Sequence, residues 1–355
     1  MRAGNLTVAV FPRTLAFKQP AGTSRGVYHE RKVWYVVVRD GDRTGIGECA
    51  PLHDLSADYT PDYEDTLVRA CNHLQQTGEV DAAGLERYPS VLFGLETAML
   101  SLAAGGSRLG DTPFSRGECG IEINGLIWMG DYDTMLARID GKLQAGCRCM
   151  KVKIGAIDFA AEVDLLRHIR EAFPASRLEL RVDANGGFSV DEVRGKLDVL
   201  ARFDLHSIEQ PIRAGQWAEM GSLAAGSPVP VALDEELIGV YGRDNVARML
   251  DATRPAYIVV KPTLHGGMTY GARWIDEARS RGIGWWITSA LETNVGLNAI
   301  AHWCAARQTT MPQGLGTGQL FTDNVDAGIE MRDGRLWFVR DVPNGEMLEK
   351  ICQWT

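Results

Sequence analysis

Hydrophobic and polar positions follow one pattern over the first third of the chain and another over the rest. A β-branched and aromatic run at residues 33–39 is followed by a short polar turn and a second run at 44–48, which together predict an antiparallel hairpin. Apolar residues at helical spacing then predict two amphipathic helices, at 63–75 and 90–104. Residues 1–118 are therefore expected to form an α+β domain.

From about residue 120 onward, short apolar runs alternate with stretches of helical periodicity. The eight strand-like runs lie at residues 121–127, 150–154, 178–182, 207–208, 229–233, 257–260, 284–288 and 314–315. The helical stretches lie at residues 160–172, 189–201, 214–225, 246–250, 269–281 and 294–306. Such alternation favours a parallel sheet, and eight strands favour a closed (β/α)8-type barrel over residues 119–321, with its active site at the carboxyl ends of the strands. Residues 322–355, with one more strand at 335–339, are expected to return to the first domain.

Composition narrows the class of protein without identifying a function. A hydrophobic content of 45% and a charged content of 23% are ordinary for a soluble globular protein, and the net charge of −9 disfavours a nucleic-acid partner. Apolar runs stay shorter than the ~18 residues of a membrane-spanning helix, and the N-terminal residues lack the features of a signal peptide. An odd number of cysteines, seven, in a chain of this length favours reduced thiols and a cytoplasmic location.

Charged residues end four successive strand-like runs at intervals of one βα unit. These residues are Asp183, Glu209, Asp234 and Lys261. Because the carboxyl ends of barrel strands meet at one mouth, the three carboxylates are expected to lie close together and to repel one another. A divalent cation would neutralise them, and a set of ligands made only of oxygen favours Mg²⁺ or Mn²⁺ over zinc.

Two lysines, Lys151 and Lys153, are expected to point into the barrel, because side chains two apart on a strand share a face. An interior lysine must either be paired with a carboxylate or have a depressed pKa, and a depressed pKa suits a general base. Lys153 and Lys261 lie on the second and sixth predicted strands and should face each other across the barrel. A substrate carboxylate held by the metal would lie between them, with its α-proton made more acidic.

Five motifs in this order closely resemble the enolase superfamily, in its muconate-lactonising subgroup. They are Lys151-Val152-Lys153, Val182-Asp183-Ala184-Asn185-Gly186, Ile208-Glu209-Gln210-Pro211, Asp234-Glu235 and Val260-Lys261-Pro262. The resemblance implies a modified, enolase-like barrel with an N-terminal α+β capping domain that the C-terminal tail completes. It also implies roles for eight residues: metal ligands Asp183, Glu209 and Asp234, catalytic lysines Lys153 and Lys261, and catalytic neighbours Lys151, Asn185 and Glu235.

Within the superfamily the chain is most similar to the o-succinylbenzoate synthases, particularly the form found in Bacteroidetes, through residues 203–212 and 289–294. This similarity implies metal-assisted syn-dehydration of 2-succinyl-6-hydroxy-2,4-cyclohexadiene-1-carboxylate in menaquinone biosynthesis. N-acylamino-acid racemases, dipeptide epimerases and muconate-type cycloisomerases use the same lysine pair and stay open as alternatives. Dipeptide epimerases commonly carry an Asp-x-Asp pair after the last barrel strand, where residues 316–319 of this chain contain no acid.

The substrate is expected to be a small carboxylate, and three residues are candidates for further contacts with it: Ser289, Thr317 and Arg25. The polar, glycine-rich stretch 18–26 is predicted to be a long hairpin loop that acts as a lid, with residues 50–55 as a second candidate loop. The sequence leaves the oligomeric state open.

Overall fold

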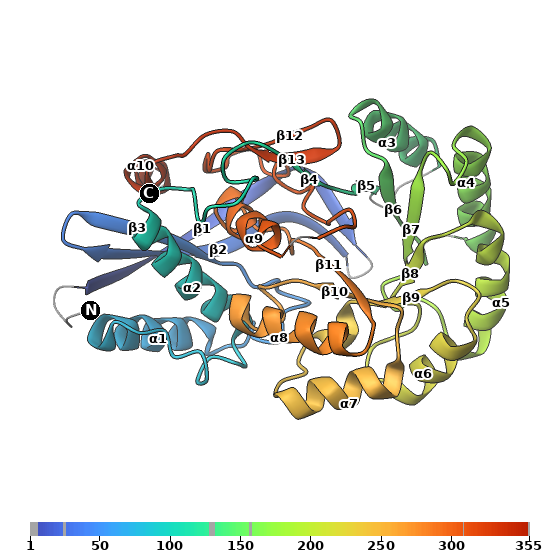
Figure 1. Cartoon of the computed structure of the whole chain (residues 1–355), viewed down its shortest axis with the longest axis horizontal. Helices are drawn as coiled ribbons and strands as arrows, with labels where there is room; N and C mark the ends of the chain where they lie inside the picture. The colour runs from blue at the N-terminus through green and yellow to red at the C-terminus, as the bar shows by residue number, and fades with distance from the viewer. Residues whose placement is uncertain (1–5, 24–25, 128–131, 156–157, 308, 354–355) are drawn as a thin grey trace.

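A computed structural model describes residues 6–23, 26–127, 132–155, 158–307 and 309–353 (Figure 1). The chain begins with an antiparallel sheet of three strands in the order β1-β2-β3, which confirms the predicted hairpin. The strands are β1 (Leu6–Thr23), β2 (Gly26–Asp40) and β3 (Arg43–Cys49). Two helices, α1 (Tyr63–Thr77) and α2 (Pro89–Ala104), pack on this sheet and cover an apolar cluster. Together these elements form the capping unit.

Helix α2 lies unusually close to β3, because the strand presents glycines to it. A Cβ added at Gly47 would collide with the backbone oxygen of Gly94, and one at Gly45 with that of Ala98. Only a residue without a side chain therefore allows this approach.

The prediction that residues 18–26 form a long loop is wrong. Strand β1 continues to Thr23, and Ala21 and Gly22 pair with Tyr28 and Val27 after a register irregularity. The hairpin therefore extends as paired strands, and its tip at residues 24–25 lies outside the described residues. The hydrogen-bond ladder explains the difference, because polar and glycine residues can pair at the end of a long two-stranded ribbon without an apolar pattern.

The second unit is a parallel sheet of seven strands in sequence order, surrounded by helices (Figure 1). Its strands are β5 (Gly125–Ile127), β6 (Cys149–Lys153), β7 (Glu179–Asp183), β8 (Ser207–Glu209), β9 (Val231–Leu233), β10 (Tyr257–Val260) and β11 (Gly284–Ile287). Its helices are α3 (Tyr132–Gln144), α4 (Phe159–Ala172), α5 (Val190–Leu200), α6 (Trp217–Gly226), α7 (Arg243–Thr253), α8 (Gly267–Ser280) and α9 (Asn294–Ala305). The largest apolar cluster fills the space inside and around this sheet.

Residues 313–314 close the barrel near the eighth strand-like run predicted at 314–315. Gly314 bridges Thr288 beyond β11, and Gln313 bridges Ile123 on the other side. The Gly314 N–H donates to the Ile287 carbonyl at 2.8 Å, and the Gln313 N–H to the Glu122 carbonyl at 2.8 Å. The fold is thus an enolase-like barrel of seven strands plus a short closing segment, as the resemblance implies.

The first predicted barrel strand, 121–127, is split in the structure. Its first part is β4 (Ile121–Glu122), which pairs with β13 (Arg335–Phe338) in a separate sheet with β12 (Ile329–Arg332). The predicted strand at 335–339 therefore exists but does not join the capping unit. That return is made by α10 (Asn344–Gln353), where the Asn344 amide donates to the carbonyls of Thr44 and Ser101 at 2.6 and 2.9 Å.

Side chains from both ends of the chain share one apolar cluster beside the capping sheet. It contains Leu15 and Phe17 of β1, Val295 of α9, and Met347 and Ile351 of α10. The capping unit is therefore held against the barrel by burial of apolar surface as well as by hydrogen bonds. Among the described residues, we find no helix with the length and apolar character needed to cross a membrane.

Candidate active site at the mouth of the barrel

The predicted acidic residues lie at the carboxyl ends of three neighbouring strands. Asp183 ends β7, Glu209 ends β8, and Asp234 directly follows β9. The parallel register places Lys153 beside Asp183 and Asp183 beside Glu209. All three carboxylates are at most 1% exposed. The strand register alone therefore brings these charges together, as the spacing along the sequence predicts.

The lysines at this mouth are paired with these carboxylates. The Lys151 ammonium lies 2.8 Å from Glu209 Oε1, and the Lys153 ammonium lies 2.6 Å from Asp183 Oδ2. Lys261 donates to Asp234. Burial lowers the pKa of Lys151, but the charges of Glu209 and Asp183 outweigh burial and leave its pKa raised. The same balance, with Asp234 as the main partner, leaves the pKa of Lys261 raised. An interior lysine was expected either to pair with a carboxylate or to have a depressed pKa. The structure shows that Lys151 and Lys261 are paired.

The three carboxylates differ in how well their charges are compensated. Burial raises the pKa of Glu209, and the nearby Asp183 charge raises it further, so it lies well above the ordinary value. Burial also acts on Asp183, but Lys153 and Lys151 outweigh it and hold its pKa well below the ordinary value. The lysines therefore compensate the charge of Asp183 more fully than that of Glu209.

The chemistry of this donor set fits a hard divalent cation. The donors are carboxylate oxygens only, which suits Mg²⁺ or Mn²⁺. Asp234 Oδ1 is buried and has no hydrogen-bond partner among the described residues, so it is a free acceptor at the site. Within those same residues, no three His, Cys, Asp or Glu side chains already have the spacing of a metal site. The ammonium groups of Lys151, Lys153 and Lys261 lie against oxygens of Asp183 and Asp234.

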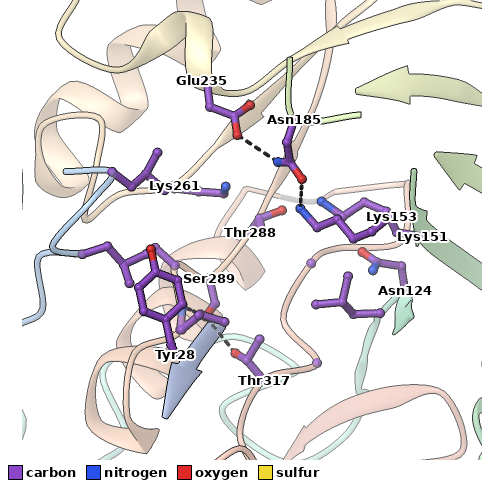
Figure 2. Close-up of a pocket in the computed structure, with 17 residues that line it drawn as sticks. Tyr28, Asn124, Lys151, Lys153, Asn185, Glu235, Lys261, Thr288, Ser289 and Thr317 are labelled. Carbon is purple, nitrogen blue, oxygen red and sulfur yellow. Dashed lines mark hydrogen bonds between the residues drawn. The ribbon is translucent and has the colours of Figure 1, made fainter. Parts of the chain in front are cut away.

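Asn185 forms hydrogen bonds with both Lys153, the predicted base, and Glu235. Its Oδ1 accepts from the Lys153 ammonium at 2.6 Å, and its Nδ2 donates to Glu235 Oε1 at 2.9 Å (Figure 2). Its own N–H donates to Asp183 Oδ1 at 3.0 Å. Asn185 has a positive φ of 45°, a conformation that asparagine tolerates better than most residues. The structure thus links two of the three predicted catalytic neighbours to Lys153, Asn185 directly and Glu235 through Asn185.

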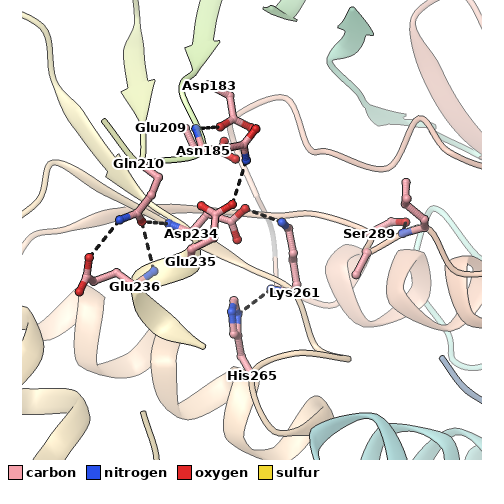
Figure 3. Close-up of polar contacts among 12 residues, drawn as sticks. Asp183, Asn185, Glu209, Gln210, Asp234, Glu235, Glu236, Lys261, His265 and Ser289 are labelled. Atoms are coloured by element: carbon pink, nitrogen blue, oxygen red, sulfur yellow. Dashed lines mark hydrogen bonds and ion pairs between the residues drawn. The ribbon is translucent and has the colours of Figure 1, made fainter. Parts of the chain in front are cut away.

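Three residues with supporting contacts were not assigned a role from the sequence: Gln210, Glu236 and His265. Gln210 Oε1 accepts from the N–H groups of Asp234 and Glu236 at 3.2 and 3.1 Å, and its Nε2 donates to Glu236 Oε2 at 3.0 Å (Figure 3). His265 Nδ1 accepts from the Lys261 N–H at 2.9 Å. The sequence feature that could have indicated Gln210 is its position directly after Glu209, a predicted metal ligand.

A pocket opens at this mouth. Lys261 projects into it from one side, and Lys151 and Lys153 project from the opposite side (Figure 2). The capping unit contributes Tyr28, from the extended hairpin, and Leu52 and Leu55, from the second predicted loop. The pocket is therefore built by both units of the chain.

The remaining wall of the pocket contains two of the three predicted substrate contacts. Ser289 and Thr317 both line it, and the Thr317 hydroxyl donates to Ser289 Oγ at 2.7 Å. The third, Arg25, lies outside the described residues. The structure thus gathers the two lysines, Asn185, Glu235 and two hydroxyl groups around one pocket (Figure 2).

Comparison with known proteins assigns both units to the same group. An "Enolase C-terminal domain-like" family model matches residues 134–344, and a "MenC, N-terminal domain" model matches residues 8–102. An o-succinylbenzoate synthase from Desulfotalea psychrophila is 46% identical over 354 residues, covering 91% of this chain and 96% of the relative.

Solved structures agree with this assignment. The crystal structure of MenC from Desulfotalea psychrophila has a TM-score of 0.84 at 40% identity and covers 94% of this chain and 100% of that one. The muconate lactonizing enzyme from Pseudomonas putida has a TM-score of 0.79 at 21% identity, covering 98% of each chain, and supports the fold alone. The predicted family is confirmed, while the similarity to the Bacteroidetes form stays a prediction. Both family models and the close relative lead to one conclusion: this chain belongs to the o-succinylbenzoate synthase family of the enolase superfamily.

Proposed function

We propose that the protein converts 2-succinyl-6-hydroxy-2,4-cyclohexadiene-1-carboxylate to o-succinylbenzoate by syn-elimination of water, a step of menaquinone biosynthesis. The observation that carries the proposal is the pair of lysines facing one pocket from opposite sides beside three buried carboxylates. The 46% identity to an o-succinylbenzoate synthase supports this choice of reaction over others that use such a site.

Asp183, Glu209 and Asp234 are the proposed ligands of a Mg²⁺ or Mn²⁺ ion, and members of the superfamily generally use a divalent metal. The bound ion would supply positive charge that stabilises the enediolate form of the substrate carboxylate and offsets the carboxylates with which the lysines pair. Asn185 and Glu235 would hold Lys153 in place, since Asn185 contacts both.

Lys153 would act as both base and acid. Its neutral amine takes the α-proton of the substrate, so the C–H bond breaks and its electrons enter the carboxylate as an enediolate. When the C–O bond breaks on the same face, the Lys153 ammonium returns the proton to the departing hydroxyl, and water leaves. The ring becomes aromatic, which makes this second step strongly downhill. Lys261, on the opposite side of the pocket, would stabilise the enediolate by its charge.

The hydroxyls of Ser289 and Thr317, with Arg25 as a third candidate, are the proposed contacts for the rest of the substrate. Apolar side chains of the capping unit, Leu52 and Leu55, line the same pocket and would exclude water during the reaction.

The proposed setting is the cytoplasm, and the proposed partner is a small-molecule carboxylate. The seven cysteines, all within the described residues, form no disulfide, and five of them are buried, which suits a reducing compartment. The net charge of −9 argues against a nucleic-acid partner.

An isomerase is the second candidate, because racemisation needs a base on each face and both lysines reach the pocket. The decisive experiment supplies the purified protein with the cyclohexadiene carboxylate and, separately, with N-acylamino acids. We expect fast formation of o-succinylbenzoate. Efficient racemisation of N-acylamino acids without dehydration would move the assignment to isomerase.

Proton exchange in D₂O separates the roles of the lysines. If dehydration is the reaction, Lys153→Ala should lose exchange of the substrate α-proton, and Lys261→Ala should retain part of it. In a racemase, each single-lysine variant should still exchange the proton of one enantiomer.

Removal of the metal is a direct test of the proposed ligands. EDTA should abolish activity, and added Mg²⁺ or Mn²⁺ should restore it, because three close carboxylates require a cation to bind an anionic substrate. Full turnover in metal-free buffer would contradict the metal assignment.

A further inference from the structure

Two buried groups of opposite charge lie behind one wall of the pocket. Arg31, on β2 of the capping unit, is 4% exposed, and Glu292, which follows β11 of the barrel, is fully buried. The Arg31 guanidinium donates to the carbonyl oxygens of Ala290 and Ala50. Glu292 accepts from the Ala290 N–H at 2.7 Å and from the Thr263 hydroxyl at 2.5 Å. Neither charged residue lines the pocket.

The backbone of Ala290 is consequently held from both sides by charged hydrogen bonds. Its carbonyl oxygen bonds to a cation supplied by the capping unit, and its N–H bonds to an anion supplied by the barrel. Hydrogen bonds to charged groups are roughly twice as strong as neutral ones, and those that are buried are screened little by water. The position of Ala290 is therefore fixed relative to both units at once.

Ala290 is the centre of a segment that forms the pocket wall. Ser289, Ala290 and Leu291 all line the pocket, and Ser289 Oγ accepts from the Leu291 N–H at 3.1 Å. Leu291 has a positive φ of 66°, a sparsely populated conformation for a leucine that persists only where neighbouring contacts impose it. Arg31 and Glu292 hold Ala290, the residue directly before Leu291.

This wall lies away from Asn185 and Glu235, which lie beside the proposed base. Figure 2 shows Ser289 and Thr317 on the side of the pocket opposite Asn185 and Glu235. A substrate whose carboxylate and α-carbon lie among the lysines would therefore place its distal chain against residues 289–291. Displacement of this wall should weaken binding of the distal chain more than it slows the chemical step.

We propose that Arg31 is a positioning residue, which acts through Ala290 to set the wall that receives the distal part of the substrate. The identity of that substrate rests on the proposed function. Through Arg31, docking of the capping unit determines the shape of a pocket wall that belongs to the barrel.

The first test is a kinetic comparison of Arg31→Met with Arg13→Met. Arg13 is a matched control, because it also lies in the capping sheet and donates to a backbone carbonyl, that of Ile351, away from the pocket. Arg31→Met should raise KM about tenfold, the effect of one lost charged hydrogen bond, with kcat within about threefold of the parent. Arg13→Met should keep the parent KM, and Arg31→Lys should recover part of the loss.

Hydrogen exchange tests the same proposal without catalysis. In Arg31→Met, the amides of residues 289–293 should exchange faster than in the parent, while those of β6 and β7 should be unchanged. A parent protein that fails to dehydrate the proposed substrate would overturn the proposed function, but the exchange comparison would still decide the role of Arg31.

Three outcomes would overturn the proposal. They are a parent-like KM with parent-like exchange in Arg31→Met, an equal KM change in Arg13→Met, and a loss of kcat alone that Arg31→Lys fails to recover. If Arg31→Met does not fold, Arg31→Gln and Glu292→Gln weaken the two sides separately. Both should then raise KM, and parent-like values in both would equally reject the positioning role.

Discussion

At the scale of single residues, Lys153 shows how the site combines pairing with access. Its ammonium contacts Asp183 and Asn185, yet its side chain still lines the pocket. A lysine with only a structural role would not need a face open to substrate. The assignment of Lys153 as the base therefore rests on its position as well as on the resemblance.

Replacing Lys153 by alanine should remove activity without unfolding the protein. Loss of acid–base catalysis should lower kcat by about 10²–10⁴-fold, while the circular dichroism spectrum stays that of the parent. Lys32→Ala, an exposed lysine of the capping unit, is the control. A folded Lys153→Ala variant with kcat near the parent value would show that the mechanism is wrong.

A second prediction at this scale concerns the contact between β3 and α2. Gly47→Ala should destabilise the protein by about 1–3 kcal/mol or more, because the added Cβ collides with the backbone of α2. The matched control is Gly195→Ala in α5, where a Cβ meets nothing within 4 Å. That change should be neutral or stabilising by up to about 1 kcal/mol, because alanine favours helices. Thermal unfolding of both variants measures the difference, and equal melting temperatures would contradict it.

At the scale of elements, the ends of β8 and β9 are joined by one side chain. Gln210 extends from the residue after Glu209 and holds the backbone of Asp234 and Glu236. Gln210 itself has a positive φ of 41°, a sparsely populated conformation for glutamine. The distance between two proposed metal ligands is therefore set by a hydrogen-bonded connection between neighbouring strands.

Gln210→Leu should weaken this connection while keeping a similar side-chain volume. We expect a loss of about 10–100-fold in metal affinity, typical when a residue that orients metal ligands is replaced. Titration of activity with Mg²⁺ and calorimetry with Mn²⁺ would measure it. Gln216→Leu is the control, because the partly exposed Gln216 side chain donates to the Arg213 carbonyl, away from the proposed ligands. Unchanged metal affinity in Gln210→Leu would reject the role.

Most elements were predictable, because local pattern and tertiary contacts agree. The strand ends carrying Asp183, Glu209, Asp234 and Lys261 follow from spacing alone. The split of residues 121–127 was not predictable, because the pairing partners of β4 lie more than 200 residues away in β13. The contact of Arg31 with Ala290 could not be predicted either, because these two residues are also far apart in the sequence. The domain limits at residues 118 and 321, and the roles of the site residues, stay predictions.

At the scale of the whole molecule, the capping unit and the barrel meet through buried polar groups. Glu48 at the end of β3 accepts from the N–H groups of Thr293 and Gly296, at the N-terminus of α9, both at 2.8 Å. Burial raises the pKa of Glu48 to about 7, although the hydrogen bonds from Thr293 act in the opposite direction. This junction therefore binds a proton more tightly in the folded protein than in the unfolded chain.

The raised pKa predicts how stability depends on pH. An unfolded Glu48 titrates near its ordinary value of 4.5 and the folded one near 7, so its contribution is greatest below about 4.5 and declines as pH rises to about 7. Each pKa unit corresponds to about 1.4 kcal/mol, so the decline should amount to a few kcal/mol. Glu48→Gln should lose less stability between pH 5 and pH 7.5 than the parent. Denaturant unfolding at both values measures this, with exposed Glu330→Gln as control, and equal losses in parent and Glu48→Gln would contradict it.

The return of α10 to the first sheet affects how the protein is made. Leu15 and Phe17 of β1 leave the ribosome early, but Met347 and Ile351, which share their apolar cluster, are synthesised more than 300 residues later. At about 5–20 residues per second, the nascent sheet waits roughly 15–60 s for its partner helix. During that interval the apolar face of the nascent chain that contains Leu15 and Phe17 is exposed. Chaperone binding should therefore concentrate on residues of β1, and a chain truncated before residue 344 should keep this apolar face exposed.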